Sequence, residues 1–598
     1  MTSPFTLEKF DKQLVNVATG TVVSADVASR LTNANELGTA AMEGFVENRL
    51  KTNKVPFYAP VKKINLGTFP SAAASKKKKT DTNAATKLAM VNEDRELFSR
   101  IVVVATTREM DLKRVFCHEL SSVPYALAHV DGTLRKATKS SLLNELEKNV
   151  SAVGSLPEAP TAWIIDGMAI LQMAGTCGVQ TFGELSEHML NILLRPFNSP
   201  LCIRVDVVFD SYKNEYSIKS FERARRKSSD VIEVKIMNAS SPLPKDWKRS
   251  MSGTKNKDNL TNFLCEEWCT SAQKKLKQNQ LLILGGGFAD STEVRAIRNE
   301  EVVSLDILKS TQEEADTRLI LHAAHAAPTT EQVVIWSPDT DVAVLCCYFA
   351  QELLTRIYFK TGVKDKTRFI PIHDMAASLG KNMCKIIPAL HCLTGCDSTS
   401  GLFGIGKTKP VRWAMNNEKD ASLLGELGES EVVSEQLEEA CTHLICQMYD
   451  QKHKGKNIND LRYRLFCRKQ SRNEDLPPTT DSLRQHIKRA NYQCLVWKLA
   501  LQSQPLIPSP VGNGWCITEG EMHPVLMTLD PAPKALLNVI TCACKTSGCR
   551  GRCTCSSEGL ICTAACNCEG GETCHNPHKA SEYAVCEESS EEDASDDE

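Results

Sequence analysis

Three apolar runs in the middle of the chain end on acidic residues, and this pattern constrains the fold more than any other feature. The runs are TAWIID, LCIRVDVVFD and EQVVIWSPDTD, which end at Asp166, Asp210 and Asp341. A fourth apolar run, QLLILGGGF, ends without an acid. Segments long enough for helices separate the four runs. This arrangement is typical of an α/β domain in which helices flank a mostly parallel sheet.

The carboxyl ends of parallel strands meet at one edge of a sheet, where α/β proteins place their chemistry. The sequence therefore predicts that Asp166, Asp210, Asp339 and Asp341 lie close together. Ionised carboxylates in such a group repel each other unless cations neutralise them. Taken singly, each acid is explained equally well by a turn or a helix cap, so the prediction depends on the whole group.

Two further stretches add acids to the same region. TQEEADTRLILHAAHA places Glu313, Glu314 and Asp316 at the start of a predicted helix, where the helix dipole alone would favour them. LTGCDSTSGLFGIGKTK places Asp397 before a glycine-rich turn between two predicted helices, and such a turn can bind phosphate. GLFGIGKT also fits the P-loop pattern, but a polar stretch precedes it instead of a strand. Nucleotide binding is therefore the weaker alternative.

In this order, the elements resemble the PIN-like nuclease superfamily, specifically its flap-endonuclease and XPG branch. The motifs are IIDGMAIL, VVFDSYKNEYSIKSFERARR, EEAD, SPDTD and TGCDSTSGLFGIGKTK, within residues 160 to about 415. The resemblance implies a PIN-like α/β sheet, a helix-hairpin-helix element and metal-dependent nuclease activity. The segment between Arg226 and Glu314 does not resemble the arch of that family. The whole chain is similar to a group of uncharacterised animal proteins with a suggested link to transposons.

The resemblance also implies residue roles. Two Mg²⁺ or Mn²⁺ ions would be bound by seven carboxylates, with one ion at Asp166, Asp210, Glu314 and Asp316 and the other at Asp339, Asp341 and Asp397. Phosphate groups would be contacted by Lys219, Arg223, Arg225, Arg226, Gly404, Gly406 and Lys407. For the first four of these, a solvated basic helix face is an equally good interpretation.

A cysteine-rich segment lies near the C-terminus, with nine cysteines at Cys542, Cys544, Cys549, Cys553, Cys555, Cys562, Cys566, Cys568 and Cys574. The start of the chain lacks a signal peptide, so we expect an intracellular, reducing environment in which clustered cysteines bind metal. The segment resembles the tesmin-type CXC domain, which implies three Zn²⁺ ions held by nine thiolates. DNA binding follows from that resemblance, with Arg550 and Arg552 as phosphate contacts. A purely structural zinc module or a protein-docking surface is the alternative.

The charge of the chain is unevenly distributed. Its formal net charge is −2, but residues 587–598 carry eight acids, so the remainder sums to +6 (−2 plus 8) and favours an anionic partner. The predicted organisation is a low-complexity segment (1–95), an accessory α/β segment (96–158), a PIN-like domain (159–430), a helical region (431–535), a CXC module (541–577) and an acidic disordered tail (587–598). The β-branched run IVVVAT at 101–106 favours a strand.

Two functions remain open. The first is a metal-dependent nuclease that acts in the nucleus on nucleic acid, on DNA rather than RNA, with chromatin proteins as further partners and no membrane. The second is a catalytically inactive DNA- or chromatin-binding adaptor with a domesticated nuclease fold. Acids that are dispersed, or neutralised by lysine or arginine instead of ions, would favour the adaptor.

Overall fold

The structure is a computed structural model of the chain. It describes residues 13–61, 98–99, 101–105, 111–175, 178–211, 217–220, 231–299, 301–362, 366–453, 455–469, 473–533, 542–544, 549, 553–557, 559–564, 566–571 and 574–578. The predictions for Arg223, Arg225, Arg226, Arg550, Arg552 and the tail 587–598 fall outside these residues. The chain forms two compact units. The first contains Met1–Lys79, Lys136–Leu444 and His486–Val525, and the second contains Thr80–Arg135, Ile445–Gln485 and Leu526–Glu598.

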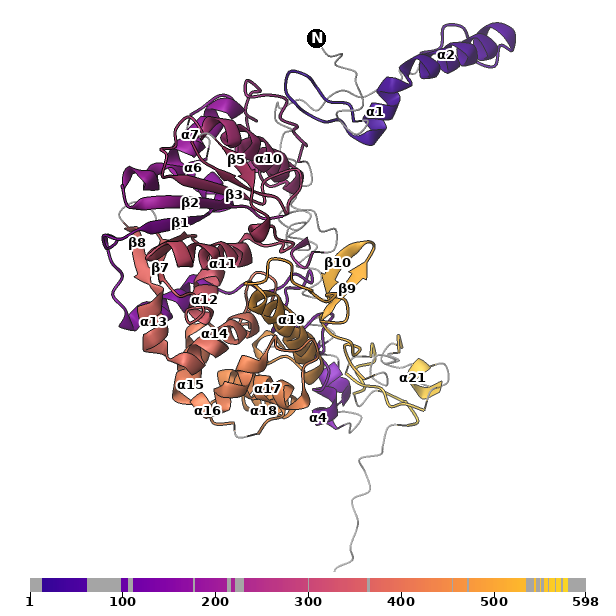
Figure 1. The fold of residues 1–598 in the computed structure, drawn as a ribbon. Helices are drawn as coiled ribbons and strands as arrows, with labels where there is room; N and C mark the ends of the chain where they lie inside the picture. Colours follow the sequence, from indigo (N-terminus) through magenta and orange to yellow (C-terminus); the bar gives the residue numbers. More distant parts are fainter. Residues whose placement is uncertain are drawn as a thin grey trace, which may run out of the picture. The chain divides into compact units, whose positions relative to one another are not determined.

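An eight-stranded sheet forms the centre of the first unit, in the order β5-β4-β3-β2-β1-β6-β7-β8 (Figure 1). The strands are β1 (Thr161–Asp166), β2 (Cys202–Val208), β3 (Leu281–Gly285), β4 (Val294–Ile297), β5 (Val302–Ser304), β6 (Gln332–Trp336), β7 (Arg356–Thr361) and β8 (Arg368–Pro371). The four central pairs, from β3 to β7, are parallel. The pairs that involve β4 and β8 are antiparallel. The predicted mostly parallel sheet with flanking helices is confirmed.

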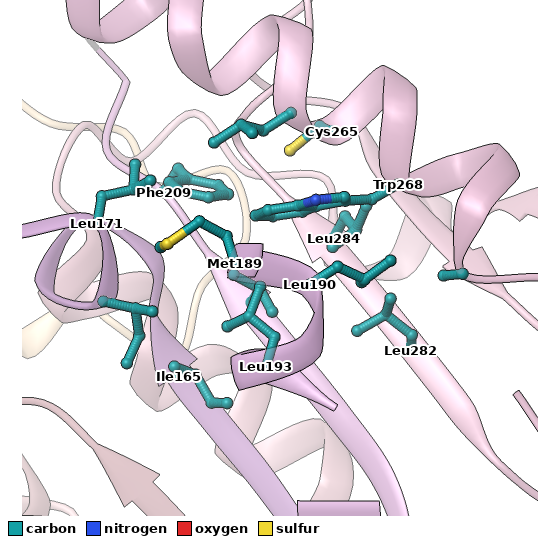
Figure 2. Close-up of a cluster of buried hydrophobic side chains, with 14 of the residues drawn as sticks. Ile165, Leu171, Met189, Leu190, Leu193, Phe209, Cys265, Trp268, Leu282 and Leu284 are labelled. Carbon is teal, nitrogen blue, oxygen red and sulfur yellow. The ribbon is translucent and has the colours of Figure 1, made fainter. Parts of the chain in front are cut away.

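One face of β1, β2 and β3 is covered by α6 (Gly167–Ala174), α7 (Phe182–Leu193) and α10 (Thr254–Ser271). Figure 2 shows the apolar core between these layers, in which the Phe209 and Trp268 rings stack with their centroids 6.3 Å apart. The indole N–H of Trp268 donates a hydrogen bond to the main-chain oxygen of Ser186 (3.0 Å). The buried indole nitrogen therefore has a hydrogen-bond partner.

The opposite face of the sheet is packed against α11 (Ala315–Ala326) and is joined to it by a buried polar group. On β2, Arg204 forms two hydrogen bonds of 2.7 Å with Asp206. His322 of α11 lies 2.7 Å from the same carboxylate. Burial alone would raise the pKa of Asp206, but Arg204 and His322 lower it. This contact fixes α11 against β2, and the first turn of α11 carries Asp316.

Further helices of the first unit lie before, between and after the strands along the chain. They are α1 (Ala25–Thr32), α2 (Ala34–Phe45), α5 (Ser140–Leu146), α9 (Trp247–Ser250), α12 (Thr340–Tyr348), α13 (Ile372–Leu379), α14 (Lys381–Leu393), α15 (Thr408–Asn416) and α16 (Glu418–Ala421). The hairpin of β9 (Trp515–Thr518) and β10 (Glu521–Pro524) also belongs to this unit. It lies within the region 431–535, which the sequence predicted to be largely helical because the long α17 (Glu435–Tyr449) and α19 (Thr480–Lys498) dominate its pattern.

The second unit contains α4 (Leu112–Val115) and α18 (Ile458–Lys469). Its buried Glu119 accepts hydrogen bonds from the main-chain N–H (2.8 Å) and the hydroxyl (2.9 Å) of Thr479. The strand predicted at 101–106 is wrong, because residues 101–105 are helical. Ile101, Val104 and Ala105 are buried at a helical spacing, so packing overrides the β propensity of the valines. No helix within the described ranges is long and apolar enough to span a membrane.

Candidate metal centre

The acids at the ends of β1 and β2 are held near each other by the apolar core. Asp166 is the last residue of β1 and pairs in register with Val208 of β2, two residues before Asp210. Gly167 follows Asp166, and a Cβ atom added there would lie 2.3 Å from the Phe209 ring. The absence of a side chain at Gly167 therefore leaves room for the Phe209 ring. The parallel pairing of β1 and β2 places the two aspartates on the same edge of the sheet.

Helix α11 and the end of β6 (Gln332–Trp336) bring further acids to this edge. The main-chain N–H of Ala315 donates to the Asp210 carboxylate (2.8 Å), which ties the start of α11 to the end of β2. Ser337 links the acids of β1 and β6, since its hydroxyl lies 3.3 Å from the Asp166 carboxylate and accepts a hydrogen bond from the N–H of Asp339 (3.1 Å). Asp339 caps α12, which places Asp341 in the first turn of that helix.

The densest part of the site is formed by Asp316, Asp339 and Asp341. One carboxylate oxygen from each of these residues lies within 4.8 Å of the other two, so together they could hold a metal ion. Asp316 and Asp341 are buried, and Asp339 is partly exposed. Hard divalent ions such as Mg²⁺ and Mn²⁺ prefer oxygen ligands of this kind. The donor set therefore fits the ions that the sequence suggested.

Lys139 enters the same cluster from the segment just before α5 (Ser140–Leu146). Its ammonium nitrogen lies 3.3 Å from a carboxylate oxygen of Asp339, 2.8 Å from one of Asp341 and 2.6 Å from one of Asp397. Burial alone would lower the pKa of Lys139, but the three carboxylates raise it well above its usual value. Nothing in the sequence around Lys139 predicted this position, because the segment carries no motif and lies 200 residues or more from its partners.

Lys219 lies beside the other acids of the site. Its ammonium nitrogen is 3.1 Å from Glu314 and 4.0 Å from Asp316. The sequence predicted Lys219 as a phosphate contact, and the structure places it next to two of the predicted metal ligands. An ammonium group here can meet an anionic substrate at the edge of the acidic cluster.

The carboxylates of the site differ in how readily they ionise. Burial raises the pKa of Asp166 to about 6, with a further contribution from Asp210, and burial together with Asp341 raises that of Asp339 to about 7. Burial also raises the pKa of Asp316. For Asp341 burial is outweighed, because Lys139 and His391 lower its pKa well below the usual value. Lys219 and Lys139 also outweigh burial at Asp397 and lower its pKa, so the site contains acids that take up protons near neutral pH beside acids that stay ionised.

His391 of α14 (Lys381–Leu393) supports Asp341 from inside the protein, and no motif in the sequence indicates this role. Its Nε2 atom lies 2.8 Å from the Asp341 carboxylate, and its ring stacks on Trp497 with centroids 5.8 Å apart. Lys407 is buried behind it and donates to the main-chain oxygen of His391 (2.9 Å) and to the hydroxyl of Thr394 (3.0 Å). In this conformation the Lys407 ammonium group therefore forms its hydrogen bonds inside the protein.

The glycine-rich turn lies between α14 and α15 (Thr408–Asn416), as the sequence predicted for this element. Gly404 and Gly406 are exposed, and Gly404 has φ +69°, a conformation that favours glycine. Helix α14 precedes the turn, so the strand that a P-loop requires is missing from this position. The nucleotide-binding alternative loses its structural basis here.

Sulfur atoms gather in the C-terminal segment of the second unit. The Sγ atom of Cys542 lies 3.6 Å from that of Cys568, 3.8 Å from that of Cys562 and 3.9 Å from that of Cys549. Tetrahedral zinc with Zn–S bonds of about 2.3 Å separates its sulfur ligands by about 3.8 Å. All nine predicted cysteines belong to overlapping groups of four that could hold a metal: Cys542, Cys544, Cys549, Cys553, Cys555, Cys562, Cys566, Cys568 and Cys574.

Main-chain hydrogen bonds favour the metal-binding thiolate form of two of these cysteines. Burial opposes ionisation of Cys553 and Cys568, but hydrogen bonds from the main-chain N–H groups of Ser556 and Gly570 help to lower the pKa of each to about 7. A thiolate, not a thiol, is the zinc ligand. The arrangement therefore fits a cluster in which thiolates share metal ions.

The raised carboxylate pKa values predict a pH-dependent response to metal. Below about pH 6, Asp166 and Asp339 hold protons that a cation must displace, so affinity for Mn²⁺ should fall as the pH drops. We expect millimolar Mn²⁺ to raise the melting temperature at pH 8 and to lose most of that effect at pH 5. Without metal, protonation of Asp166 and Asp339 stabilises the folded state at low pH, because both pKa values are higher than in the unfolded chain. This contribution is lost as the pH rises through 6 to 7.

Thermal melts with and without Mn²⁺ at the two pH values would measure this response. The Asp166→Asn variant lacks one of the two titrating groups and should show a smaller pH dependence. Equal Mn²⁺ shifts at pH 5 and pH 8 in the unmodified protein would contradict the prediction.

Comparison with known proteins adds little. No family model matches the chain, and no curated protein sequence matches it. A solved structure of the T5 D15 protein co-crystallized with metal ions is similar over 57% of this chain and 92% of that chain, with 10% sequence identity and a TM-score of 0.28. At that TM-score the similarity carries no weight for function, which has to be inferred from the residues of the site.

Proposed function

We propose that this protein is a metal-dependent nuclease of the PIN-like superfamily, in its flap-endonuclease and XPG branch, which hydrolyses phosphodiester bonds with two divalent ions. The observation that carries the proposal is the group formed by Asp316, Asp339 and Asp341, whose oxygens lie within 4.8 Å of one another at the carboxyl edge of the sheet. Buried carboxylates at this density require positive charge, and the edge is where open α/β sheets bind ligands.

The carboxylates would divide between two Mg²⁺ or Mn²⁺ ions, with Asp166, Asp210, Glu314 and Asp316 at one and Asp339, Asp341 and Asp397 at the other. When bound, such ions supply an activated water and stabilise the leaving oxygen of an in-line displacement. Lys219 would contact a non-bridging oxygen of the substrate phosphate from beside Glu314. His391 would hold Asp341 in its ligating orientation, as buried partners of metal ligands commonly do.

The cysteine-rich segment would act as a CXC-type module that holds three Zn²⁺ ions with nine thiolates and binds nucleic acid. Its Sγ–Sγ distances of 3.6–3.9 Å around Cys542 support shared tetrahedral sites. Binding of DNA or chromatin by this module would concentrate the nuclease on its substrate and place it in the nucleus.

A substrate panel tests the proposed activity. The purified full-length protein would be incubated with labelled flap, duplex and single-stranded DNA and with single-stranded RNA, in Mg²⁺, Mn²⁺ or EDTA. We expect cleavage of at least one DNA substrate with either metal ion and none with EDTA. Absence of cleavage from every substrate and both ions, in a protein that still melts cooperatively, would reject the proposal.

An inactive nucleic-acid-binding adaptor is the second candidate, and one observation favours it. Lys139 already forms ion pairs with Asp339, Asp341 and Asp397, so part of the cluster is neutralised by the protein itself. The same panel separates the two functions. An adaptor would shift labelled DNA in a gel without cutting it in any metal ion, whereas a nuclease would cut it.

A further inference from the structure

The position of Lys139 conflicts with full occupancy of the site by two ions. The proposed function assigns Asp339, Asp341 and Asp397 to one divalent ion, yet an oxygen of each lies 2.6–3.3 Å from the Lys139 ammonium nitrogen. An ammonium group and a divalent cation that share these oxygens would repel each other at very short range. The lysine and the ion therefore exclude one another.

Several contacts hold the Lys139 segment in place, so its position does not depend on one flexible side chain. Helix α5, which follows Lys139, packs against α12 and α15 and pairs Glu145 with Arg412 at 2.8 and 3.1 Å. The ammonium group of Lys136 donates to the main-chain oxygen of Asp397 (3.0 Å). On the other side, a Cβ atom added to Gly401 would lie 3.1 Å from the main-chain nitrogen of Ala137.

The Lys139 side chain can nevertheless leave the cluster by rotating into solvent. It keeps 20% of its surface exposed, whereas the Asp341 side chain keeps 2%. The lysine ends in a compact charge on a four-carbon stem, which can rotate into solvent without movement of the main chain. The Asp339 and Asp397 side chains are each 29% exposed, so an ion from solvent can reach the same oxygens.

We propose that Lys139 is a built-in competitor for one of the two metal positions. Its ammonium group occupies the oxygens of Asp339, Asp341 and Asp397 in the resting protein, so a divalent ion binds these three residues only after Lys139 has left. The inference rests on the proposed function for the identity of the ions, but it concerns metal binding and not cleavage. Once displaced, the ammonium group would remain at the edge of the cluster, where an anionic phosphate can hold it away from the carboxylates.

Mn²⁺ titration of the full-length protein, followed by calorimetry and by electron paramagnetic resonance of free Mn²⁺, tests this competition. Lys139→Gln should bind the weaker Mn²⁺ ion at least about tenfold more tightly than the unmodified protein, within the usual range of coupling between two ligands. Lys139→Arg keeps the charge and should behave like the unmodified protein. Lys148→Gln is the matched control, because Lys148 lies near α5 but pairs only with Glu145 among the ion pairs that the structure describes.

Thermal melts give a second readout. Without metal, Lys139→Gln leaves three carboxylates without their cation and should melt at a lower temperature, and Mn²⁺ should restore the loss. Gly401→Ala serves as a further variant if Lys139→Gln does not fold, because the added methyl group presses on Ala137 while Lys139 stays intact. It should tighten Mn²⁺ binding in the same direction.

Unchanged or weaker Mn²⁺ binding in Lys139→Gln and in Gly401→Ala would overturn the inference. Its failure can be distinguished from failure of the proposed function. Tighter Mn²⁺ binding in Lys139→Gln, with no cleavage by any variant, would refute the nuclease and support the competition. Metal-dependent cleavage with the same Mn²⁺ affinity in every variant would support the nuclease and refute the competition.

Discussion

Replacement of Asp341 by asparagine should reduce Mg²⁺-dependent cleavage by about 10²–10³-fold or more, the size expected when one preorganised charged group is removed from an active site. Asp341 carries the negative charge that a metal ligand needs, because Lys139 and His391 lower its pKa and keep it ionised. Asparagine keeps the shape and can still accept the hydrogen bond from His391. Asparagine lacks the negative charge that helps to bind a divalent ion. Initial cleavage rates on the best substrate of the panel would measure the loss.

Two controls make this result interpretable. Asp374→Asn changes an exposed aspartate in the first turn of α13 (Ile372–Leu379), outside the cluster, and should leave the rate unchanged. Asp339→Asn should lose activity like Asp341→Asn, with a smaller effect on folding because Asp339 is partly exposed. Both cluster variants should still bind labelled DNA. If Asp341→Asn cleaves at the unmodified rate, the assignment of this residue to the metal centre is wrong.

Replacement of Cys542 by serine should remove zinc and unfold the cysteine-rich segment. Cys542 belongs to three of the four cysteine groups that could hold a metal, so its loss affects more than one ion. A segment of this kind has almost no apolar core, and apparent binding free energies of about 10–16 kcal/mol are typical of structural zinc in small domains. Plasma emission spectrometry of the full-length protein should find three zinc ions, and fewer than two in the variant.

Cys467→Ser is the matched control for zinc content, because Cys467 is an exposed cysteine of α18 (Ile458–Lys469) outside the cluster. It should retain all the zinc. Limited proteolysis provides an independent readout, and the C-terminal segment should be cut faster in Cys542→Ser and in protein treated with a strong zinc chelator. A full complement of zinc in Cys542→Ser would exclude the shared cluster.

The sequence predicted the α/β class of the fold because apolar strands that alternate with helix-length segments are typical of a parallel sheet with helical crossovers. It missed the strands β4, β5, β7 and β8, none of which contains an acidic residue. It was wrong for residues 101–105, where three buried positions at helical spacing outweigh β-branched side chains. Local propensity is weak compared with burial, so such segments are decided by their packing partners.

By itself, the sequence determined which acids can meet. Strand ends in a parallel sheet share an edge, and so Asp166, Asp210 and Asp339 are brought together by topology alone. Only the tertiary structure decided what neutralises and supports them. Lys139 reaches the cluster from about 200 residues away and His391 from 50, through packing that no local periodicity encodes. Charge compensation depends on distance in space, whereas sequence patterns report only the periodicity of each element.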